Sequence, residues 1–321
     1  MRILVTGGGG FLGSHLVDRL RVEGEDPVVP RRADYDLVDA AAVERLFRDA
    51  RPDIVFHLAA EAGGIGANRV NPGRYWYANL AMGLNVLEES RRAAIDKLIL
   101  VGSVCAYPER TAVPFREDHL WTGYPEPTNA PYGVAKRALL TGAQAYREQY
   151  GLNAVYLVPV NLYGPRDNFD LEKSHVIPAI IRRTIEAREN GAKSVVLWGD
   201  GSPTREFLYV EDCAEALILA ARRYDGSEPV NIGTGEEIAI RDLARLVAET
   251  TGYEGAFSWD ATKPGGQPRR RLDVTRAETC FGFRARTPLR RGLQRTVDWF
   301  RQVRPVRADE GERLEGARVR G

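Results

Sequence analysis

Short apolar runs alternate with amphipathic helical patterns through the first half of the chain. Short apolar runs bounded by turn residues are typical of buried strands, whereas apolar positions at helical spacing predict helices packed on one face. The runs cover 2–6, 28–29, 54–58, 98–101 and 154–159, and the helical patterns cover 11–23, 40–49, 75–94 and 132–150. Because strands alternating with helices of this length form parallel sheets, we expect an α/β fold with a doubly wound parallel sheet, the Rossmann arrangement.

The alternating pattern ends at the turn Tyr163-Gly-Pro165. Beyond it, the pattern predicts helices over 176–189 and 241–251 and an extended segment over 194–198. We therefore expect a second, smaller α+β domain that holds the substrate. The expected limits are 1–165 plus 206–232 for the Rossmann domain, 166–205 plus 233–303 for the substrate domain, and 304–321 for a mobile charged tail.

Charge and cysteine content narrow the class of protein. The 321 residues carry a formal net charge of +1, so overall charge favours neither nucleic acid nor a membrane as a partner. No apolar run approaches the ~20 residues of a membrane span, and the N-terminus does not resemble a signal peptide. Three widely spaced cysteines argue against a disulfide framework and fit a reducing cytoplasm. With four histidines and no Cys-x-x-Cys pair, no metal site is expected.

Glycines are concentrated between the first strand and the first helix, in Thr6-Gly-Gly-Gly-Gly-Phe-Leu-Gly13. Only glycine lets the backbone approach a pyrophosphate closely, and the helix behind the turn supplies amides and a positive dipole end. The strand before the turn and the helix after it are the context that this motif requires. The spacing Gly8-x-Gly10-x-x-Gly13 also matches the generic pattern. We expect the dinucleotide to be bound by Gly7, Gly10, Phe11, Leu12 and Gly13.

Two arginines, Arg31 and Arg32, follow the second predicted strand, where an acidic residue is usual when NAD is bound. They favour a 2′-phosphate and hence NADP(H), although a solvated arginine pair is the alternative. After that turn, Asp36 and Leu37 are expected to flank the adenine.

A serine, a tyrosine and a lysine form the candidate catalytic group. Ser103 follows the strand 98–101 directly and is expected at the carboxyl edge of the sheet, where doubly wound folds bind ligands. Tyr132 and Lys136 are four residues apart on one helix face, so the ammonium is expected to lower the pKa of the phenol and to hold the nicotinamide ribose. Serine and tyrosine would then polarise a substrate carbonyl during hydride transfer.

Cys105 and His175 are further candidates. Cys105 lies two residues beyond Ser103, on the same side if the chain stays extended there. A buried inert cysteine and a hydrogen-bonded structural histidine are the common alternatives, which spacing alone leaves open.

Several longer motifs resemble the extended short-chain dehydrogenase/reductase superfamily and, within it, the GDP-L-fucose synthase family. The resemblance covers about residues 1 to 300. It rests on Ala62-Gly-Gly-Ile-Gly-Ala-Asn68, Gly102-Ser-Val-Cys-Ala-Tyr-Pro108, Glu126-Pro-Thr-Asn-Ala-Pro-Tyr132, Asn161-Leu-Tyr-Gly-Pro165, Asp167-Asn-Phe169, Ser174-His-Val-Ile-Pro-Ala179 and Trp198-Gly-Asp-Gly-Ser-Pro-Thr-Arg-Glu-Phe207.

The resemblance implies that Cys105 and His175 act as base and acid. They would epimerise C3 and C5 of a nucleotide 4-keto-6-deoxysugar before NADPH reduces C4. It also implies a GDP-linked substrate, a homodimer formed by the helices at 75–94 and 132–150, and substrate contacts by Asn161, Arg183, Trp198, Arg205 and Lys263.

The chain departs from the family at Glu61, where members typically carry lysine, and at Val104, Gly133 and Val160. These changes leave open which sugar and which nucleotide the substrate contains, and another 4-ketosugar such as a heptose would also fit. Two different functions are also open: an epimerase that recycles bound NAD(P), and a non-catalytic dinucleotide-binding regulator. For the oligomeric state, a monomer with ordinary amphipathic helices is the alternative.

Overall fold

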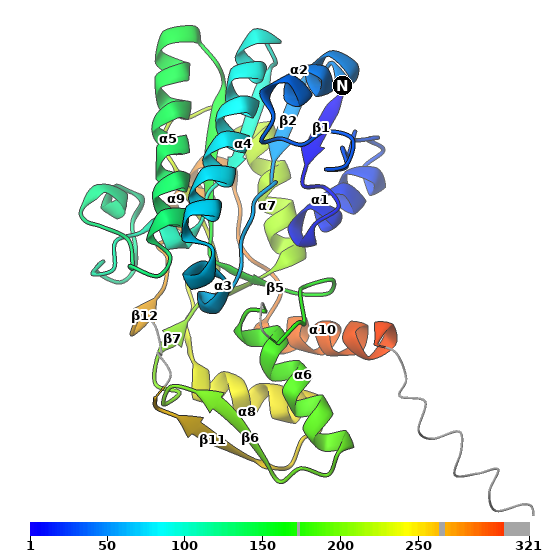
Figure 1. Cartoon of the computed structure of the whole chain (residues 1–321), viewed down its shortest axis with the longest axis vertical. Coiled ribbons are helices and arrows are strands. Elements are labelled where there is room, and N and C mark those ends of the chain that lie inside the picture. Colours follow the sequence, from blue (N-terminus) through cyan, green and yellow to red (C-terminus); the bar gives the residue numbers. More distant parts are fainter. Residues whose placement is uncertain (172–173, 263–266, 305–321) are drawn as a thin grey trace, which may run out of the picture.

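The computed structural model describes residues 1–171, 174–262 and 267–304. Its larger part is built around a five-stranded sheet in the order β1-β2-β3-β4-β9, with every neighbouring pair parallel (Figure 1). These strands are almost wholly buried, which is why they read as continuous apolar runs. Their bounds are β1 (Ile3–Thr6), β2 (Ile54–His57), β3 (Lys97–Val101), β4 (Ala154–Pro159) and β9 (Val230–Ile232).

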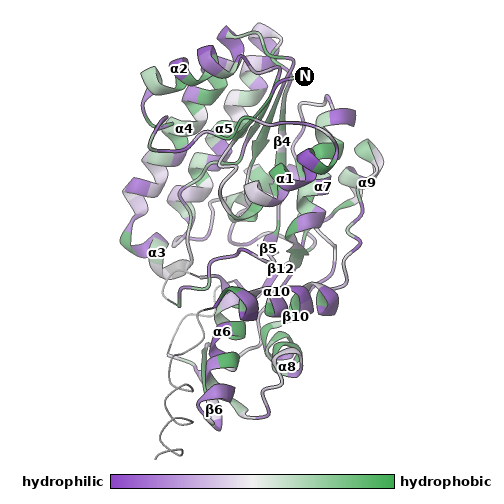
Figure 2. Cartoon of the chain, turned by 90° about the vertical axis from the view of Figure 1, so that its right-hand side faces the viewer, coloured by the Kyte–Doolittle hydropathy of each residue, from purple (hydrophilic) through white to green (hydrophobic). Residues whose placement is uncertain are grey.

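Helices cover both faces of this sheet (Figure 2). One face carries α2 (Ala40–Ala50), α4 (Pro72–Arg92) and α5 (Ala130–Tyr150), and the other carries α1 (Phe11–Val22) and α7 (Val210–Arg223). Two shorter helices, α3 (Ile65–Val70) and α9 (Thr275–Phe281), contact α4 and α7 respectively. The predicted doubly wound α/β class is therefore confirmed.

A smaller part with its own hydrophobic cluster lies beyond the carboxyl ends of the strands (Figure 1). It contains α6 (Val176–Glu189), α8 (Ile240–Thr251) and α10 (Leu289–Val303), with β6 (Ser194–Trp198) parallel to β11 (Ala256–Asp260). The described residues form two further small sheets: β5 (Asn161–Tyr163) pairs with β8 (Phe207–Tyr209), and β7 (Thr204–Arg205) lies between β10 (Ile238–Ala239) and β12 (Arg269–Arg270). The exact domain limits stay a prediction, and residues 305–321 of the predicted tail lie outside the described residues.

The predicted strand at Val28 and Val29 is wrong. Val28 makes an isolated parallel bridge to Leu4, and its two backbone hydrogen bonds, to Ile3 and Val5, are the contacts that join it to β1. Pro27 and Pro30 flank the run and have no N–H group to donate, so the pairing does not extend.

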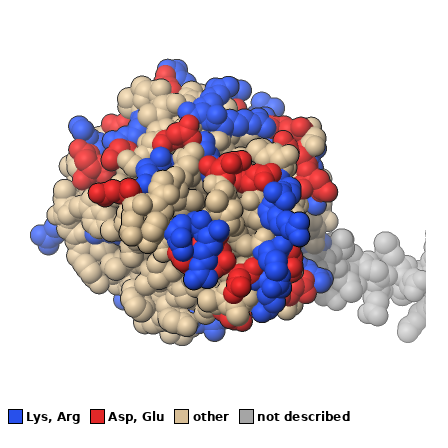
Figure 3. Space-filling model, turned by 90° about the horizontal axis from the view of Figure 1, so that it is seen from above, with Lys and Arg blue, Asp and Glu red and all other residues tan. Residues whose placement is uncertain are grey.

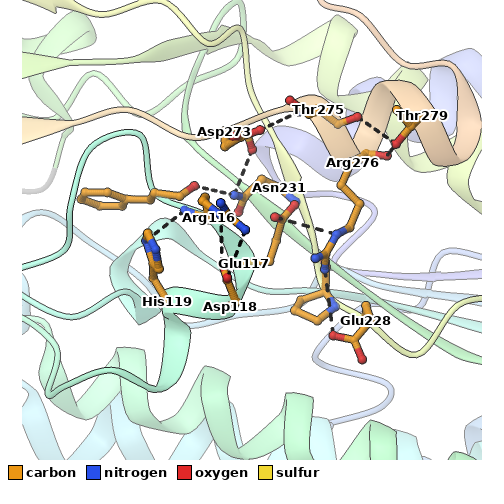
Figure 4. Close-up of polar contacts among 12 residues, drawn as sticks. Arg116, Glu117, Asp118, His119, Glu228, Asn231, Asp273, Thr275, Arg276 and Thr279 are labelled. Atoms are coloured by element: carbon orange, nitrogen blue, oxygen red, sulfur yellow. Dashed lines mark hydrogen bonds and ion pairs between the residues drawn. The ribbon is translucent and has the colours of Figure 1, made fainter.

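A buried polar cluster fixes the segment between β3 and α5 (Figure 4). The Glu117 carboxylate, in the turn η2 (Glu117–Trp121), accepts the backbone N–H of Asn231 at 3.0 Å. The Asn231 amide donates to the carbonyls of Phe115 at 2.9 Å and Asp273 at 3.1 Å, and the Tyr107 hydroxyl donates to its oxygen at 2.7 Å. The segment that follows β3 is thus tied to β9 and to the chain before α9.

The surface carries charges of both signs. Seen from above the view of Figure 1, basic and acidic side chains are interspersed, as the small net charge implies (Figure 3). Within the described ranges, no helix has both the length and the apolar character needed to cross a membrane. The same ranges hold no group of three or more His, Cys, Asp or Glu side chains placed to bind a metal ion.

Candidate active site

A cavity of about 490 Å³ opens at the carboxyl ends of β1, β2, β3 and β4. It extends from the glycine turn after β1 to the residues that follow β3, the first turn of α5 and the start of α6. The predicted site residues that line it are Gly7, Gly10, Phe11, Leu12, Gly13, Arg32, Asp36, Leu37, Ser103, Cys105, Tyr132, Asn161 and His175.

The turn after β1 has the shape of a dinucleotide cradle. Gly7 has a φ of +72°, and a Cβ on Gly13 would lie 2.1 Å from the Gly7 carbonyl oxygen, so neither position accepts a side chain without displacement. Helix α1 begins after Gly10, which supplies no side-chain cap, so the first amides of the helix are left for a ligand or solvent. These features fit a pyrophosphate bound at the helix N-terminus.

The structure separates the two arginines predicted to bind a 2′-phosphate. Arg32 lines the cavity, whereas Arg31 is exposed, pairs with Asp34 at 2.8 Å and is not part of the lining. Arg31 opens a hydrogen-bonded turn, in which its carbonyl accepts the backbone N–H groups of Asp34 and Tyr35 at 3.0 Å each, and Arg32 follows within that turn.

Glu61 lies at the same end of the cavity and joins two arginines. Its carboxylate accepts hydrogen bonds from the Arg74 guanidinium at 2.6 and 3.0 Å and from the Arg32 guanidinium at 3.1 Å. The hydrogen bond from Arg74 is the main reason why the pKa of Glu61 lies below its usual value. Sequence reasoning singled out Glu61 but missed Arg74, because α4 brings that arginine to Glu61 from outside any motif.

Ser103 and Cys105 are placed by a turn rather than by an extended chain. Ser103 caps the 3-10 turn η1 (Val104–Ala106), and its hydroxyl accepts the Cys105 backbone N–H at 3.2 Å. The condition of an extended chain, on which the predicted placement of Cys105 depended, is not met here, since the serine side chain itself favours the turn. Both residues nevertheless line the cavity.

Tyr132 and Lys136 share the first turns of α5 but differ in their access to the cavity. Tyr132 lines the cavity and makes a hydrogen bond with Ser103. Lys136 is buried, with Nζ 5.7 Å from the centre of the Tyr132 ring and donating to the Val101 carbonyl at 2.9 Å. In the sheet, Val101 is the last residue of β3, so this bond ties α5 to the strand that leads to Ser103.

Burial dominates the titration of both groups. It raises the pKa of the Tyr132 phenol, an effect that Cys105 adds to and the Ser103 hydrogen bond opposes. Burial also lowers the pKa of Lys136 to about 8. The net pKa of Tyr132 is therefore raised rather than lowered, because removal of the phenol from water is the largest contribution, and a lowering contribution from Lys136 stays a prediction.

His175 and Cys105 contribute to the cavity from different elements. His175 immediately precedes α6, and it keeps access to solvent at the cavity. Desolvation by the surrounding protein lowers the pKa of His175. Cys105 is partly exposed, and Nη1 of Arg270 lies 3.9 Å from its Sγ.

The residues expected to contact the substrate are not all gathered at this cavity. Asn161 lines it and donates to the Glu206 carbonyl at 3.0 Å, and Arg205 interacts electrostatically with Cys105. Burial, and next the charge of Arg270, lower the pKa of Arg205 to about 10.

Arg183 and Trp198 do not line the cavity but lie in the smaller part of the molecule. Arg183 donates to the Val196 carbonyl at 2.8 Å, so it is beside β6, and Trp198 is 51% exposed at the end of that strand. Lys263 lies outside the described residues.

Comparison with known proteins identifies the class that this fold and cavity define. Residues 3–233 match the NAD dependent epimerase/dehydratase family, and the chain belongs to it. The predicted resemblance is thereby confirmed, and it extends to a narrower group. The chain is 44% identical over 300 residues to GDP-L-fucose synthase 1 of Arabidopsis thaliana, covering 93% of each protein.

Solved structures agree with this assignment. The fold is similar to a GDP-6-OMe-4-keto-L-xylo-heptose reductase from Campylobacter jejuni, with a TM-score of 0.88, 28% identity and coverage of 94% of this chain and 97% of that one. It is also similar to a GDP-L-fucose synthetase from Naegleria fowleri bound to NADP, with a TM-score of 0.86, 30% identity and 94% of each chain covered.

Proposed function

We propose that this protein is an NADPH-dependent epimerase and reductase that converts GDP-4-keto-6-deoxymannose to GDP-L-fucose. One observation carries the proposal: Ser103, Cys105, Tyr132 and His175 line a single cavity that continues into the glycine cradle. The names of the relatives, GDP-L-fucose synthases at 40% to 44% identity, support the same activity. Because one of the structural neighbours is a heptose reductase, a GDP-linked 4-ketoheptose is the alternative substrate.

The cofactor site is assigned to residues of the cradle and its rim. Gly7, Gly10 and Gly13 would hold the pyrophosphate, and Arg32 the 2′-phosphate that distinguishes NADP(H). Lys136, buried beside the Tyr132 ring, would hold the nicotinamide ribose. When bound, the cofactor supplies the hydride for the ketone.

The cavity residues divide the proton chemistry between them. A C4 ketone acidifies the C–H bonds at C3 and C5, and Ser103 and Tyr132 would hydrogen-bond the oxygen on which negative charge develops. Cys105 takes a proton from the carbon, and His175 returns one to the opposite face of the ring, which inverts the centre. The raised pKa of Tyr132 keeps its phenol protonated near neutral pH, as a proton donor to the C4 oxygen must be.

The nucleotide part of the substrate is assigned to the smaller part of the molecule. Arg205 and Asn161 connect the cavity to that part, and Arg183, Trp198 and Lys263 are proposed to contact the GDP moiety. A guanidinium suits a diphosphate, and an exposed indole suits a base or sugar. In this proposal the Rossmann domain binds the cofactor and the substrate domain binds the GDP moiety of the sugar nucleotide.

We also propose a homodimer that functions in the cytoplasm. Large apolar side chains are exposed along α4, namely Trp76, Tyr77 and Leu84, and Tyr150 is exposed at the end of α5. The two helices pack side by side (Figure 1), so a second copy could cover both.

Cofactor consumption distinguishes the proposed activity from that of an epimerase that recycles its cofactor. With GDP-4-keto-6-deoxymannose, we expect one NADPH to be oxidised for each GDP-L-fucose formed. Conversion of the sugar without net NADPH loss would favour the recycling epimerase. Activity with a GDP-4-ketoheptose alone would support the proposed mechanism but show that the substrate is a different sugar. Cofactor binding without turnover of any sugar would favour the non-catalytic regulator.

A further inference from the structure

We propose that Arg270 is a positioning residue for Cys105, holding the sulfur in place and stabilising its thiolate. This inference rests on the proposed role of Cys105 as the base. Arg270 is only 9% exposed, and its Nη1 lies 3.9 Å from Cys105 Sγ, within hydrogen-bond reach of a sulfur acceptor. It comes from β12, far along the chain from Cys105, so no motif around the cysteine contains it.

The guanidinium of Arg270 is fixed by a chain of hydrogen bonds. Its Nε donates to the side-chain oxygen of Gln267. The amide nitrogen of Gln267 donates in turn to the carbonyls of Pro108 at 3.3 Å and Glu109 at 2.5 Å. Because these carbonyls follow Cys105 in the same short segment, the arginine and the cysteine are held in one arrangement.

A second arginine lies beside the first. Strand β12 pairs in parallel with β7, and the register places Arg270 opposite Arg205. The two guanidinium groups repel each other, and Cys105 interacts favourably with Arg205. A thiolate near two cations relieves that repulsion, so the pair favours the charged form of the sulfur.

Further titratable groups lie around the sulfur. Tyr132 and His175 line the same cavity, and the Tyr132 phenol is uncharged near neutral pH because burial raises its pKa. Burial raises the pKa of the Glu126 carboxyl, but local hydrogen bonds and, as a smaller contribution, the charge of Arg270 bring it below its usual value. Among the described residues, Arg270 and Arg205 are the two cations that the structure places against Cys105.

Alkylation of the cysteine tests this proposal without any sugar substrate. We would measure the pH dependence of iodoacetamide modification of Cys105 by peptide mass spectrometry in the full-length protein. The exposed Cys280 in the same molecule is the internal standard, and Cys213 is buried. In Arg270→Met, we expect Cys105 to react about tenfold more slowly at pH 7 and the midpoint of its profile to move up by about one pH unit.

Two further variants separate electrostatics from damage to the fold. Arg270→Lys keeps the charge and is expected to restore a large part of the reactivity. Arg269→Met is the matched control, since Arg269 is exposed and pairs with Glu237. An unchanged Cys105 profile in Arg270→Met would overturn the proposal, and so would an equal upward shift in Arg269→Met. If Arg270→Met does not fold, the lysine variant decides, because a profile like that of the native protein is then required.

The sugar substrate gives a separate result. If alkylation shifts as expected but no 4-ketosugar is turned over, the role of Arg270 stands and the proposed function fails. If the sugar is turned over and the alkylation profile does not move, the proposed function stands and the role of Arg270 fails.

Discussion

Lys136, which we propose holds the nicotinamide ribose, is expected to lower the stability of the folded protein. It is only 3% exposed, and in the described part of the chain no carboxylate forms an ion pair with it. Its ammonium donates to the Val101 carbonyl, and burial lowers its pKa from 10.5 to about 8. Since a tenfold change in a proton-binding constant is worth about 1.4 kcal/mol, folding with a charged Lys136 costs about 3 kcal/mol at pH 7.

We therefore predict that Lys136→Met raises the free energy of unfolding at pH 7. Loss of the hydrogen bond to Val101 offsets about 1 kcal/mol, which leaves a net gain of about 2 kcal/mol. The gain depends on pH, because the unfolded state binds more protons than the folded state between pH 8 and 10.5. The stability of the native protein rises through that window and that of the variant does not, so the gain should shrink by about 2 kcal/mol between about pH 7 and 9.5.

The assay is chemical denaturation of both proteins across this pH range, without cofactor. Lys97→Met is the matched control, since Lys97 is also buried but contacts Asp225 and the Ala221 carbonyl, each at 2.7 Å. Removing that paired lysine should destabilise the protein by about 1–3 kcal/mol. A Lys136→Met variant that is less stable than the native protein at pH 7, or whose difference does not change with pH, would refute the reasoning.

Three further variants test the cavity and the surface. Gly13→Ala should weaken NADP binding at least about tenfold in a fluorescence titration, because the added Cβ meets the Gly7 carbonyl. Gly9→Ala is the control and should bind NADP normally, since no atom lies within 4 Å of its added Cβ. Equal affinities of the two variants would contradict the proposed pyrophosphate site at the glycine turn. Glu61→Gln should raise the affinity for NADP relative to NAD several-fold in calorimetry, since it removes the carboxylate that pairs with both Arg32 and Arg74. An unchanged affinity ratio would count against the placement of the 2′-phosphate beside Arg32. Leu84→Arg should convert a dimer to monomers in sedimentation analysis, and a native protein that is already monomeric would exclude the proposed interface.

The central sheet could be predicted because each of its main strands is recognisable from a short stretch of the sequence. Buried parallel strands read as continuous apolar runs, and β4 and α6 have the bounds that their patterns predict. The sequence patterns do not predict α7 and α10. Both helices are amphipathic, and α10 buries Gly292, Leu293, Thr296, Val297 and Phe300 at helical spacing, so this signal was present in the sequence and was missed.

The parts of the site that lie in motifs could likewise be predicted, and those created by tertiary contacts could not. Ser103, Tyr132 and His175 follow or begin elements that the sequence indicates, and the structure brings them to one cavity. Arg74 contacts Glu61 from α4 and Arg270 contacts Cys105 from β12, and no spacing in the sequence relates either arginine to its partner. The raised pKa of Tyr132 similarly depends on burial, which helical spacing does not reveal.

Solvent hydrogen exchange tests the central claim most directly. The reaction would be run in deuterated water with GDP-4-keto-6-deoxymannose and NADPH, and the sugar product read by NMR. We predict deuterium at both C3 and C5 and inversion at both centres, with exchange lost in Cys105→Ser although that variant still binds NADP. A reduced product that carries only protium at C3 and C5 would contradict the account.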